Sequence, residues 1–175
     1  MNTRELTIIA LMTALICVAG PLSIAIGPIP LSLATFAVYL AGAVLGSKRG
    51  AISVALYLLI GAIGVPVFAG FTAGIPKLIG VTGGYLVGYL PCVVIVGLAE
   101  KLMGEKTAVW HFGLTMVAGT IVLYIIGTAW FMVQTHNPLG AALGMCVLPF
   151  LPGDAIKIVA ASVVAIPVRK AALHK

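Results

Sequence analysis

An acidic and a basic residue, Asp154 and Lys157, lie three positions apart in a chain that is otherwise poor in charge. Residues at this spacing share one face of a helix, and Pro152-Gly153 interrupts the segment before them. A lysine in the first turn of a helix opposes the helix dipole, and ionisable residues at membrane depth are candidates for function. The alternative is an N-cap aspartate followed by a lysine that reaches the membrane interface. We favour a ligand-binding pair.

A second candidate is Thr82-Gly83-Gly84-Tyr85, where a helix is expected to begin. Exposed N–H groups at a helix N-terminus can bind an anion or a carbonyl group, so Thr82 and Gly84 are candidate site residues. The same glycines can instead allow two helices to pack closely, and both interpretations stay open. Tyr85 and Tyr89 fall on one helical face, as an aromatic wall of a site or as part of an interfacial belt.

The residue sets of common catalytic and metal sites are missing from the sequence. It has no Walker A motif, no Ser/His/Asp or Cys/His set, no HExxH motif and no paired carboxylates in its apolar segments. Four acidic residues leave little for acid–base chemistry, and the three cysteines have no metal-ligand or disulfide spacing. We therefore predict no enzyme activity, no metal and no cofactor, and a chain that cannot power transport alone.

The composition places the chain in a membrane. Hydrophobic residues make up 62% of it and charged residues 8%, with a mean hydropathy of +1.22, whereas a soluble domain carries roughly a quarter charged residues. We expect one transmembrane domain over residues 1–175. The net charge of +6 comes from basic residues that sit singly or in pairs between apolar stretches. This pattern indicates topology signals and argues against nucleic acid as a partner.

Six apolar segments are separated by short breaks rich in Gly, Pro or charge, and each is expected to form a membrane helix. They cover residues 6–26, 31–46, 50–65, 79–101, 107–133 and 154–172. A further apolar piece, 139–151, is too short to span and is expected to re-enter or to lie against the bundle. The sequence thus predicts an all-α integral membrane protein with six transmembrane helices.

The two sides of this bundle differ in charge. Eight of the ten Lys and Arg residues fall in the N-terminus, the turns at 46–50 and 101–106, and the C-terminal tail. This asymmetry predicts cytoplasmic N- and C-termini in a multi-pass protein of the cell membrane. The connections on the other side are rich in Gly and Pro, and irregular backbone near membrane depth must line a cavity or pack against protein. We therefore expect a substrate pocket on the outer side.

Several motifs, taken in order, closely resemble the BioY family, the biotin-binding S components of energy-coupling factor (ECF) vitamin transporters. They are Gly-Pro-Ile-Pro-Leu at 27–31, Leu-Ala-Gly-Ala-Val-Leu-Gly at 40–46, Lys-Arg-Gly at 48–50, Gly-Val-Pro-Val-Phe-Ala-Gly at 64–70, Thr-Gly-Gly-Tyr-Leu-Val-Gly at 82–88 and Leu-Pro-Phe-Leu-Pro-Gly-Asp at 148–154. The resemblance implies a prokaryotic plasma-membrane subunit that captures biotin and works with a separate transmembrane T protein and two ATPase subunits. It also implies that Ala10 and Ala14 dock on the T protein.

Biotin fits the candidate residues chemically. Asp154 could accept from the ureido N–H groups while Lys157 donates to the ureido carbonyl. Phe36, Phe68, Tyr85 and Tyr89 could supply an apolar wall, and the carboxylate could meet loop N–H groups, Asn137 or Lys77. The resemblance adds Thr35 and Gly70 to the expected substrate contacts.

Other functions stay open from the sequence. An S component for another vitamin, such as thiamine or riboflavin, would share the same architecture. A stand-alone channel or secondary transporter for a small solute would need a through-pore or coupling-ion carboxylates, and the shortage of acidic residues disfavours it.

Overall fold

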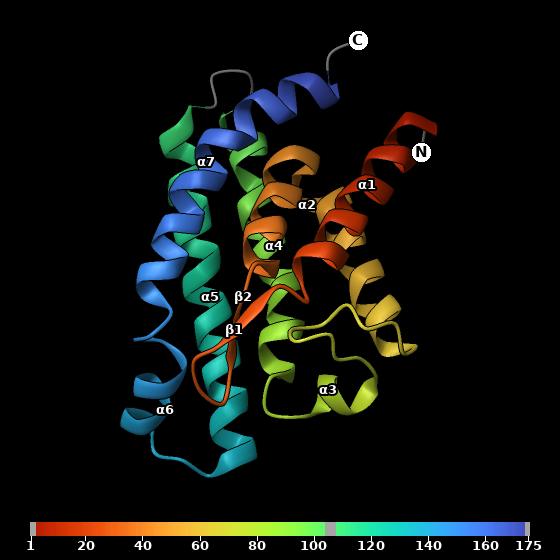
Figure 1. The fold of residues 1–175 in the computed structure, drawn as a ribbon. Coiled ribbons are helices and arrows are strands. Elements are labelled where there is room, and N and C mark those ends of the chain that lie inside the picture. Colours follow the sequence, from red (N-terminus) through yellow and green to blue (C-terminus); the bar gives the residue numbers. More distant parts are fainter. Residues whose placement is uncertain (1–2, 104–107, 174–175) are drawn as a thin grey trace.

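The computed structural model describes residues 3–103 and 108–173, without the side chains of 100–103 and 173. The regular structure of this part of the chain is helical apart from one short hairpin, with irregular segments between the elements (Figure 1). The all-α prediction is therefore confirmed. The elements are α1 Thr3–Ala19, β1 Ser23–Ala25, β2 Pro30–Ser32, α2 Ala34–Ala62, α3 Ile75–Ile79, α4 Gly83–Met103, α5 Val109–Thr135, α6 Leu139–Cys146 and α7 Leu151–Leu173.

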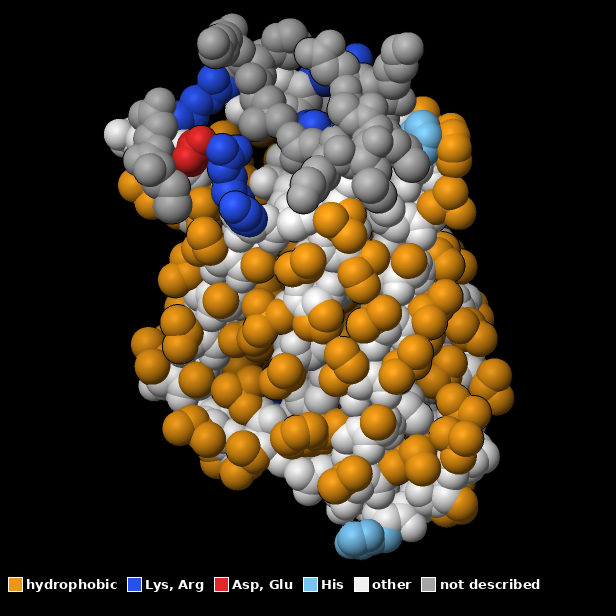
Figure 2. Space-filling view, turned by 180° about the vertical axis from the view of Figure 1, so that it is seen from behind, with side chains coloured by type: hydrophobic (Ala, Val, Ile, Leu, Met, Phe, Trp, Pro, Cys, Tyr) orange, Lys and Arg blue, Asp and Glu red, His pale blue; other side chains and the backbone are white. Residues whose placement is uncertain are grey.

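Three of the described helices are long and apolar enough to cross a membrane: Ala34–Ala62, Val109–Thr135 and Leu151–Ala172. The apolar part of α4, Gly83–Ala99, is shorter. Large hydrophobic side chains stay exposed along these helices, among them Ile125 and Ile156, and Figure 2 shows such side chains over most of one face of the molecule. A surface of this kind faces lipid in a membrane protein.

The helix α2 contains the break that the sequence places at 46–50. Gly46 has φ 72° and ψ −178°, a backbone conformation that is essentially restricted to glycine. A Cβ atom built on Gly50 would lie 3.2 Å from the Ala41 carbonyl oxygen and 3.4 Å from the Gly42 Cα, so the two halves of α2 fold back on each other. The predicted segments 31–46 and 50–65 thus correspond to the two packed halves of α2, joined at Gly46. Their outer ends are wrong, because residues 31–32 belong to β2 and residues 63–65 follow the end of α2.

The first predicted helix, 6–26, is wrong at its C-terminal end. α1 stops at Ala19, and Pro21 follows, which has no N–H to donate to a helix. The chain then forms an antiparallel hairpin in which Ser23 pairs with Ser32 and Ala25 pairs with Pro30. The apolar composition of residues 20–26 predicts a longer helix, but the glycine and proline that follow Ala19 end it.

The last predicted helix, 154–172, begins earlier than expected. α7 starts at Leu151, the Asp154 N–H donates to the Phe150 carbonyl at 2.8 Å, and Asp154 lies in the first turn. The N-cap interpretation of Asp154 is therefore wrong. Proline is tolerated in a first turn, where its missing N–H is not needed, and Pro152 accordingly lies inside the start of α7. The apolar piece 139–151 holds the short helix α6, which is too short to span as expected.

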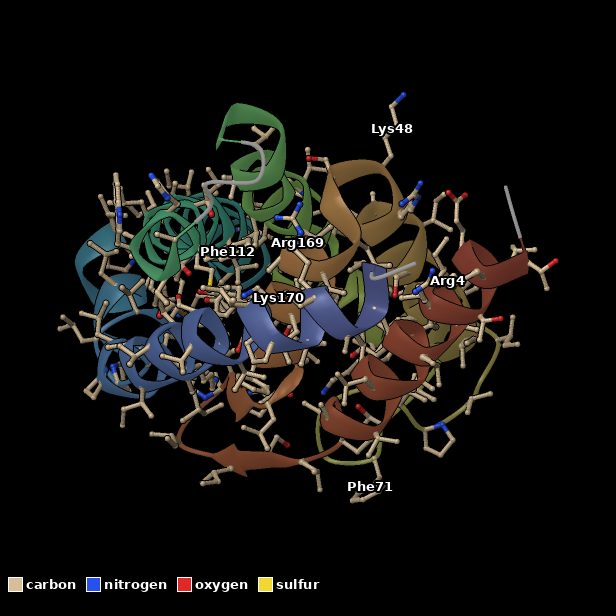
Figure 3. The ribbon with its side chains drawn as sticks, turned by 90° about the horizontal axis from the view of Figure 1, so that it is seen from above. Arg4, Lys48, Phe71, Phe112, Arg169 and Lys170 are labelled. Atoms are coloured by element: carbon tan, nitrogen blue, oxygen red, sulfur yellow. The ribbon has the colours of Figure 1, made fainter. Side chains whose placement is uncertain are left out.

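Charged side chains connect α1 to α7 and to α2 at one end of the molecule. The Arg4 guanidinium donates to the Ala172 carbonyl at 3.0 Å, and Arg49 pairs with Glu5 at 2.5 Å. Arg169 and Lys170 lie at the same end of the molecule as Arg4, which Figure 3 shows from above. The charge pattern of the sequence predicts this. The side chains of Lys101, Lys106 and Lys175 lie outside the described residues. The irregular segments that follow α2 and α5 lie towards the opposite end (Figure 1).

Candidate functional site

Asp154 and Lys157 form an ion pair inside the protein. The Lys157 Nζ lies 3.0 Å from the Asp154 Oδ1, and the two residues are only 8% and 5% exposed. Their position three residues apart in the first turns of α7 gives this contact directly. A buried charge pair carries a large desolvation cost and is tolerated only with further hydrogen bonds, so the remaining partners of the pair decide its geometry.

The Lys157 ammonium group uses all three of its N–H donors within the protein. It donates to the Ser32 carbonyl at 2.7 Å and to the Thr35 Oγ1 at 3.0 Å, in addition to Asp154. Thr35 is a predicted site residue, whereas Ser32 at the end of β2 is not predicted. A ligand that accepts from Lys157 must therefore replace one of these partners.

Asp154 is held from the other side by Tyr124 of α5, whose hydroxyl donates to Oδ2 at 2.5 Å. Each carboxylate oxygen has two acceptor positions, so Asp154 keeps unused acceptor capacity after binding Lys157 and Tyr124. The sequence does not single out Tyr124, because it is one aromatic residue within a long apolar helix, 30 residues before its partner. Lys157 and Tyr124 thus hold the Asp154 carboxylate, a hydrogen-bond acceptor, in a fixed position among apolar residues.

A cavity of about 40 Å³ lies beside this pair, and a second cavity of about 30 Å³ adjoins the first. The first is lined by Ile29, Pro30, Leu31, Ser32, Thr35, Tyr85, Tyr89, Leu123, Tyr124, Cys146, Phe150, Asp154 and Lys157. The second is lined by Ile29, Pro30, Ser32, Tyr57, Phe68, Ala69, Lys77, Thr82, Tyr85, Leu86 and Tyr89. Residues of the hairpin segment and of α4 belong to both walls, so the cavities are two parts of one site.

Several predicted residues come together here. Tyr85 and Tyr89 line both cavities, and Phe68 and Thr82 line the second. The interpretation of these tyrosines as a wall of a site, rather than as an interfacial belt, agrees with this position. The Tyr85 hydroxyl also lies 3.2 Å from the Thr128 Oγ1, which orients the ring across the cavity.

Other predicted residues lie outside the cavity walls. Phe36 packs against the hydrophobic core, and the Asn137 side chain donates to the Thr135 Oγ1 at 3.0 Å. Gly70 has φ 69° and its N–H donates to the Pro21 carbonyl at 3.1 Å, which fixes the loop against the end of α1. These residues shape loops and core, and the structure brings none of them to the Asp154–Lys157 pair.

The glycines that open α4 serve helix packing. A Cβ atom on Gly84 would collide with Trp130 of α5, and one on Gly88 would lie 2.8 Å from the Leu123 side chain. The Gly83 N–H already donates to the Gly80 carbonyl at 2.9 Å. Neither Gly83 nor Gly84 lines a described cavity, so the interpretation of close α4–α5 packing is favoured and the anion site at the glycine N–H groups is not supported.

No cluster of three or more His, Cys, Asp or Glu side chains that could hold a metal ion occurs among the described residues. The chemistry of the site is that of hydrogen bonding and shape. It combines one carboxylate with spare acceptor capacity, one ammonium group, aromatic and aliphatic walls, and a wall formed by a short hairpin.

Known proteins resemble this chain over nearly its whole length. A probable biotin transporter BioY from Pyrococcus horikoshii is 38% identical over 165 residues, which cover 94% of this chain and 96% of the relative. A biotin transporter BioY from Thermotoga maritima is 38% identical over 168 residues, covering 95% and 96%. The crystal structure of the S-component for biotin from an ECF-type ABC transporter superposes with a TM-score of 0.88 at 32% identity, covering 97% of this chain and 95% of that one. The BioY family model matches residues 1–174, and the chain belongs to the BioY family.

Proposed function

We propose that this chain is the membrane subunit that binds biotin for an ECF-type ABC transporter. The observation that carries the proposal is the buried Asp154–Lys157 pair beside a cavity with otherwise mostly apolar walls. Membership in the BioY family and the similarity to a biotin S-component support the same substrate. The chain is not an enzyme, and ATP hydrolysis belongs to separate subunits.

Biotin would place its ureido ring at the ion pair. Asp154 has acceptor positions left for a ureido N–H, whereas Lys157 has no unused donor. The ureido carbonyl would therefore take the place of the Thr35 hydroxyl on Lys157, because a hydroxyl is the partner that rotates away most easily. Tyr85 and Tyr89 would cover the apolar ring system of the ligand.

The ligand enters only if a wall of the site moves. Cavities of about 40 and 30 Å³ have room for a few water molecules and not for a bicyclic ligand. α4 is a packed core helix, while the segment with Ile29, Pro30 and Ser32 is a two-stranded hairpin between α1 and α2. The hairpin is therefore the wall that we expect to shift when biotin binds.

The proposed arrangement in the membrane has six crossings, with α2 contributing one crossing in each half. The basic residues at the end with both termini would face the cytoplasm. The site would then open on the outer side, where the hairpin and the segments around α3 and α6 lie (Figure 1). The chain would then be a multi-pass protein of the cell membrane with an outward-facing substrate site.

Transport would require docking on a T protein that is coupled to two ATPase subunits. Ala10 and Ala14 of α1 are both exposed, so they are not used for packing inside this chain. Two small residues one turn apart on an exposed helix face allow another helix to approach closely. This exposure supports the proposed docking face.

Equilibrium binding of radiolabelled biotin to the detergent-purified chain tests the proposal. We expect saturable binding that unlabelled biotin competes and that thiamine and riboflavin do not. Asp154→Asn should lose binding, while the matched control Glu5→Gln, at the far end of the molecule, should keep it. Competition by thiamine or riboflavin, or unchanged biotin affinity in Asp154→Asn, would contradict the assignment.

A further inference from the structure

Thr82 carries a hydroxyl that has no hydrogen-bond partner although it is buried. The residue is 6% exposed, and among the described residues its Oγ1 is the buried side-chain oxygen or nitrogen atom that lacks a partner. Buried polar groups are almost always hydrogen-bonded, because an unsatisfied one retains its full desolvation penalty. Thr82 lines the second cavity, so a bound ligand can supply the missing partner.

Lys77 lines the same cavity as Thr82. It is half-buried, and its ammonium group makes no hydrogen bond or ion pair with the part of the chain that the structure describes. A solvated surface lysine would explain Lys77 alone, but it would not explain the unpartnered hydroxyl beside the same space. No acidic side chain lines this cavity, so its polar groups are an ammonium group and hydroxyls, which favours an anionic ligand group.

The cavity with Lys77 and Thr82 adjoins the cavity with the Asp154–Lys157 pair. They share Ile29, Pro30, Ser32, Tyr85 and Tyr89. Thr82 precedes Tyr85 by three residues and Tyr89 by seven, about one and two helical turns. An elongated ligand with its head at the ion pair would therefore lie along the two tyrosines and reach Thr82 with its tail.

We propose that Thr82 and Lys77 form an anion subsite that binds the carboxylate of the ligand's side chain; this inference rests on the proposed function of the chain. The Thr82 hydroxyl donates to one carboxylate oxygen, and the Lys77 ammonium group supplies the opposite charge. Charge-assisted hydrogen bonds of this kind are stronger than neutral ones. The subsite gives the protein a preference for the free acid over its neutral esters and amides.

Competition between biotin and biotin methyl ester tests the subsite. The ester keeps the ureido and thiophane rings and loses only the charge of the tail. We expect the wild-type chain to bind biotin roughly 10- to 100-fold more tightly than the ester, as loss of a hydrogen bond to a charged group predicts. Thr82→Val and Lys77→Met should each weaken biotin binding by roughly 10-fold and leave the ester's affinity unchanged, so that the preference shrinks.

The controls are Thr115→Val and Lys48→Met, which make the same substitutions away from both cavities and should leave both affinities unchanged. Equal weakening of biotin and ester in Thr82→Val and Lys77→Met would show a structural role and overturn the subsite. An unchanged preference for biotin would overturn it as well. Wild-type chain that binds biotin and the ester equally would overturn the subsite alone, whereas wild-type chain that binds neither would overturn the proposed function too. Melting curves of each variant confirm that it is folded.

Discussion

Neutralising the Asp154–Lys157 pair separates its proposed role in ligand binding from its role in folding. The variants are Asp154→Asn, Lys157→Met and the double variant. Removing one partner of a buried ion pair leaves an uncompensated charge, which costs about 3–5 kcal/mol. For a chain of this length, 1 kcal/mol shifts the melting temperature by about 2–4 °C. A single variant that leaves such a charge should therefore melt about 6–20 °C lower than the wild type.

The contacts of the pair rank the variants. Lys157→Met leaves the Asp154 carboxylate with only the Tyr124 hydroxyl and removes the donor of the Ser32 carbonyl. Asp154→Asn is milder, because Lys157 keeps Ser32 and Thr35 as acceptors and the new amide oxygen can still accept a hydrogen bond. The double variant has no buried charge, so it should melt higher than Lys157→Met, with a coupling free energy of about 1–3 kcal/mol.

The assay measures melting in detergent with and without biotin, together with the affinity for biotin. A double-variant cycle on the more exposed pair Arg49–Glu5, with side chains 41% and 31% exposed, is the matched control. Its coupling should be only about 0–1 kcal/mol. All three variants at Asp154 and Lys157 should lose biotin affinity, even where the double variant recovers stability. A stable double variant that binds biotin like the wild type would refute the role of the pair in ligand binding.

Three other substitutions test single features of the structure. Tyr124→Phe removes the hydroxyl that binds the Asp154 carboxylate and should lower the free energy of unfolding by about 1.5–3 kcal/mol, measured by denaturation in detergent. Gly46→Ala forces a side chain into φ 72° and should cost about 1–3 kcal/mol in the same assay; full stability would mean that the turn is formed differently. Ala14→Trp places a large side chain on the exposed face of α1 and should leave biotin affinity unchanged while it abolishes co-purification with the proposed T-protein partner.

The sequence predicts those parts of the site that are encoded by local spacing. Asp154 and Lys157 are three residues apart on one helix, and Tyr85 and Tyr89 are four apart on another, so each pair shares a face without knowledge of the fold. A glycine pair at a helix start suggests Gly84, and an amide in an outer loop suggests Asn137, but the structure uses them for packing and for a loop contact. Residue type alone does not say which neighbour a side chain meets.

Tyr124 escaped prediction for a related reason. Its partner Asp154 lies on a different helix, and contacts between helices depend on how α5 and α7 are rotated about their axes. The hydrophobic pattern of α5 does not define that rotation, since a membrane helix is apolar both towards lipid and towards the core. A polar residue in such a helix is therefore recognisable as a candidate only when its partner is already known.

The hairpin explains why the error in the first predicted helix matters for function. If residues 20–26 continued α1, Ser32 would not lie next to Lys157. One N–H group of the Lys157 ammonium would then lack an acceptor. Ser32 instead accepts from Lys157 with its carbonyl, while its hydroxyl donates to the Gly20 carbonyl at 2.8 Å. One residue thus connects the ion pair to the end of α1, the helix whose outer face carries Ala10 and Ala14. A shift of the hairpin on ligand binding must therefore break or carry along a contact with α1, which gives the site a direct physical connection to the proposed docking helix.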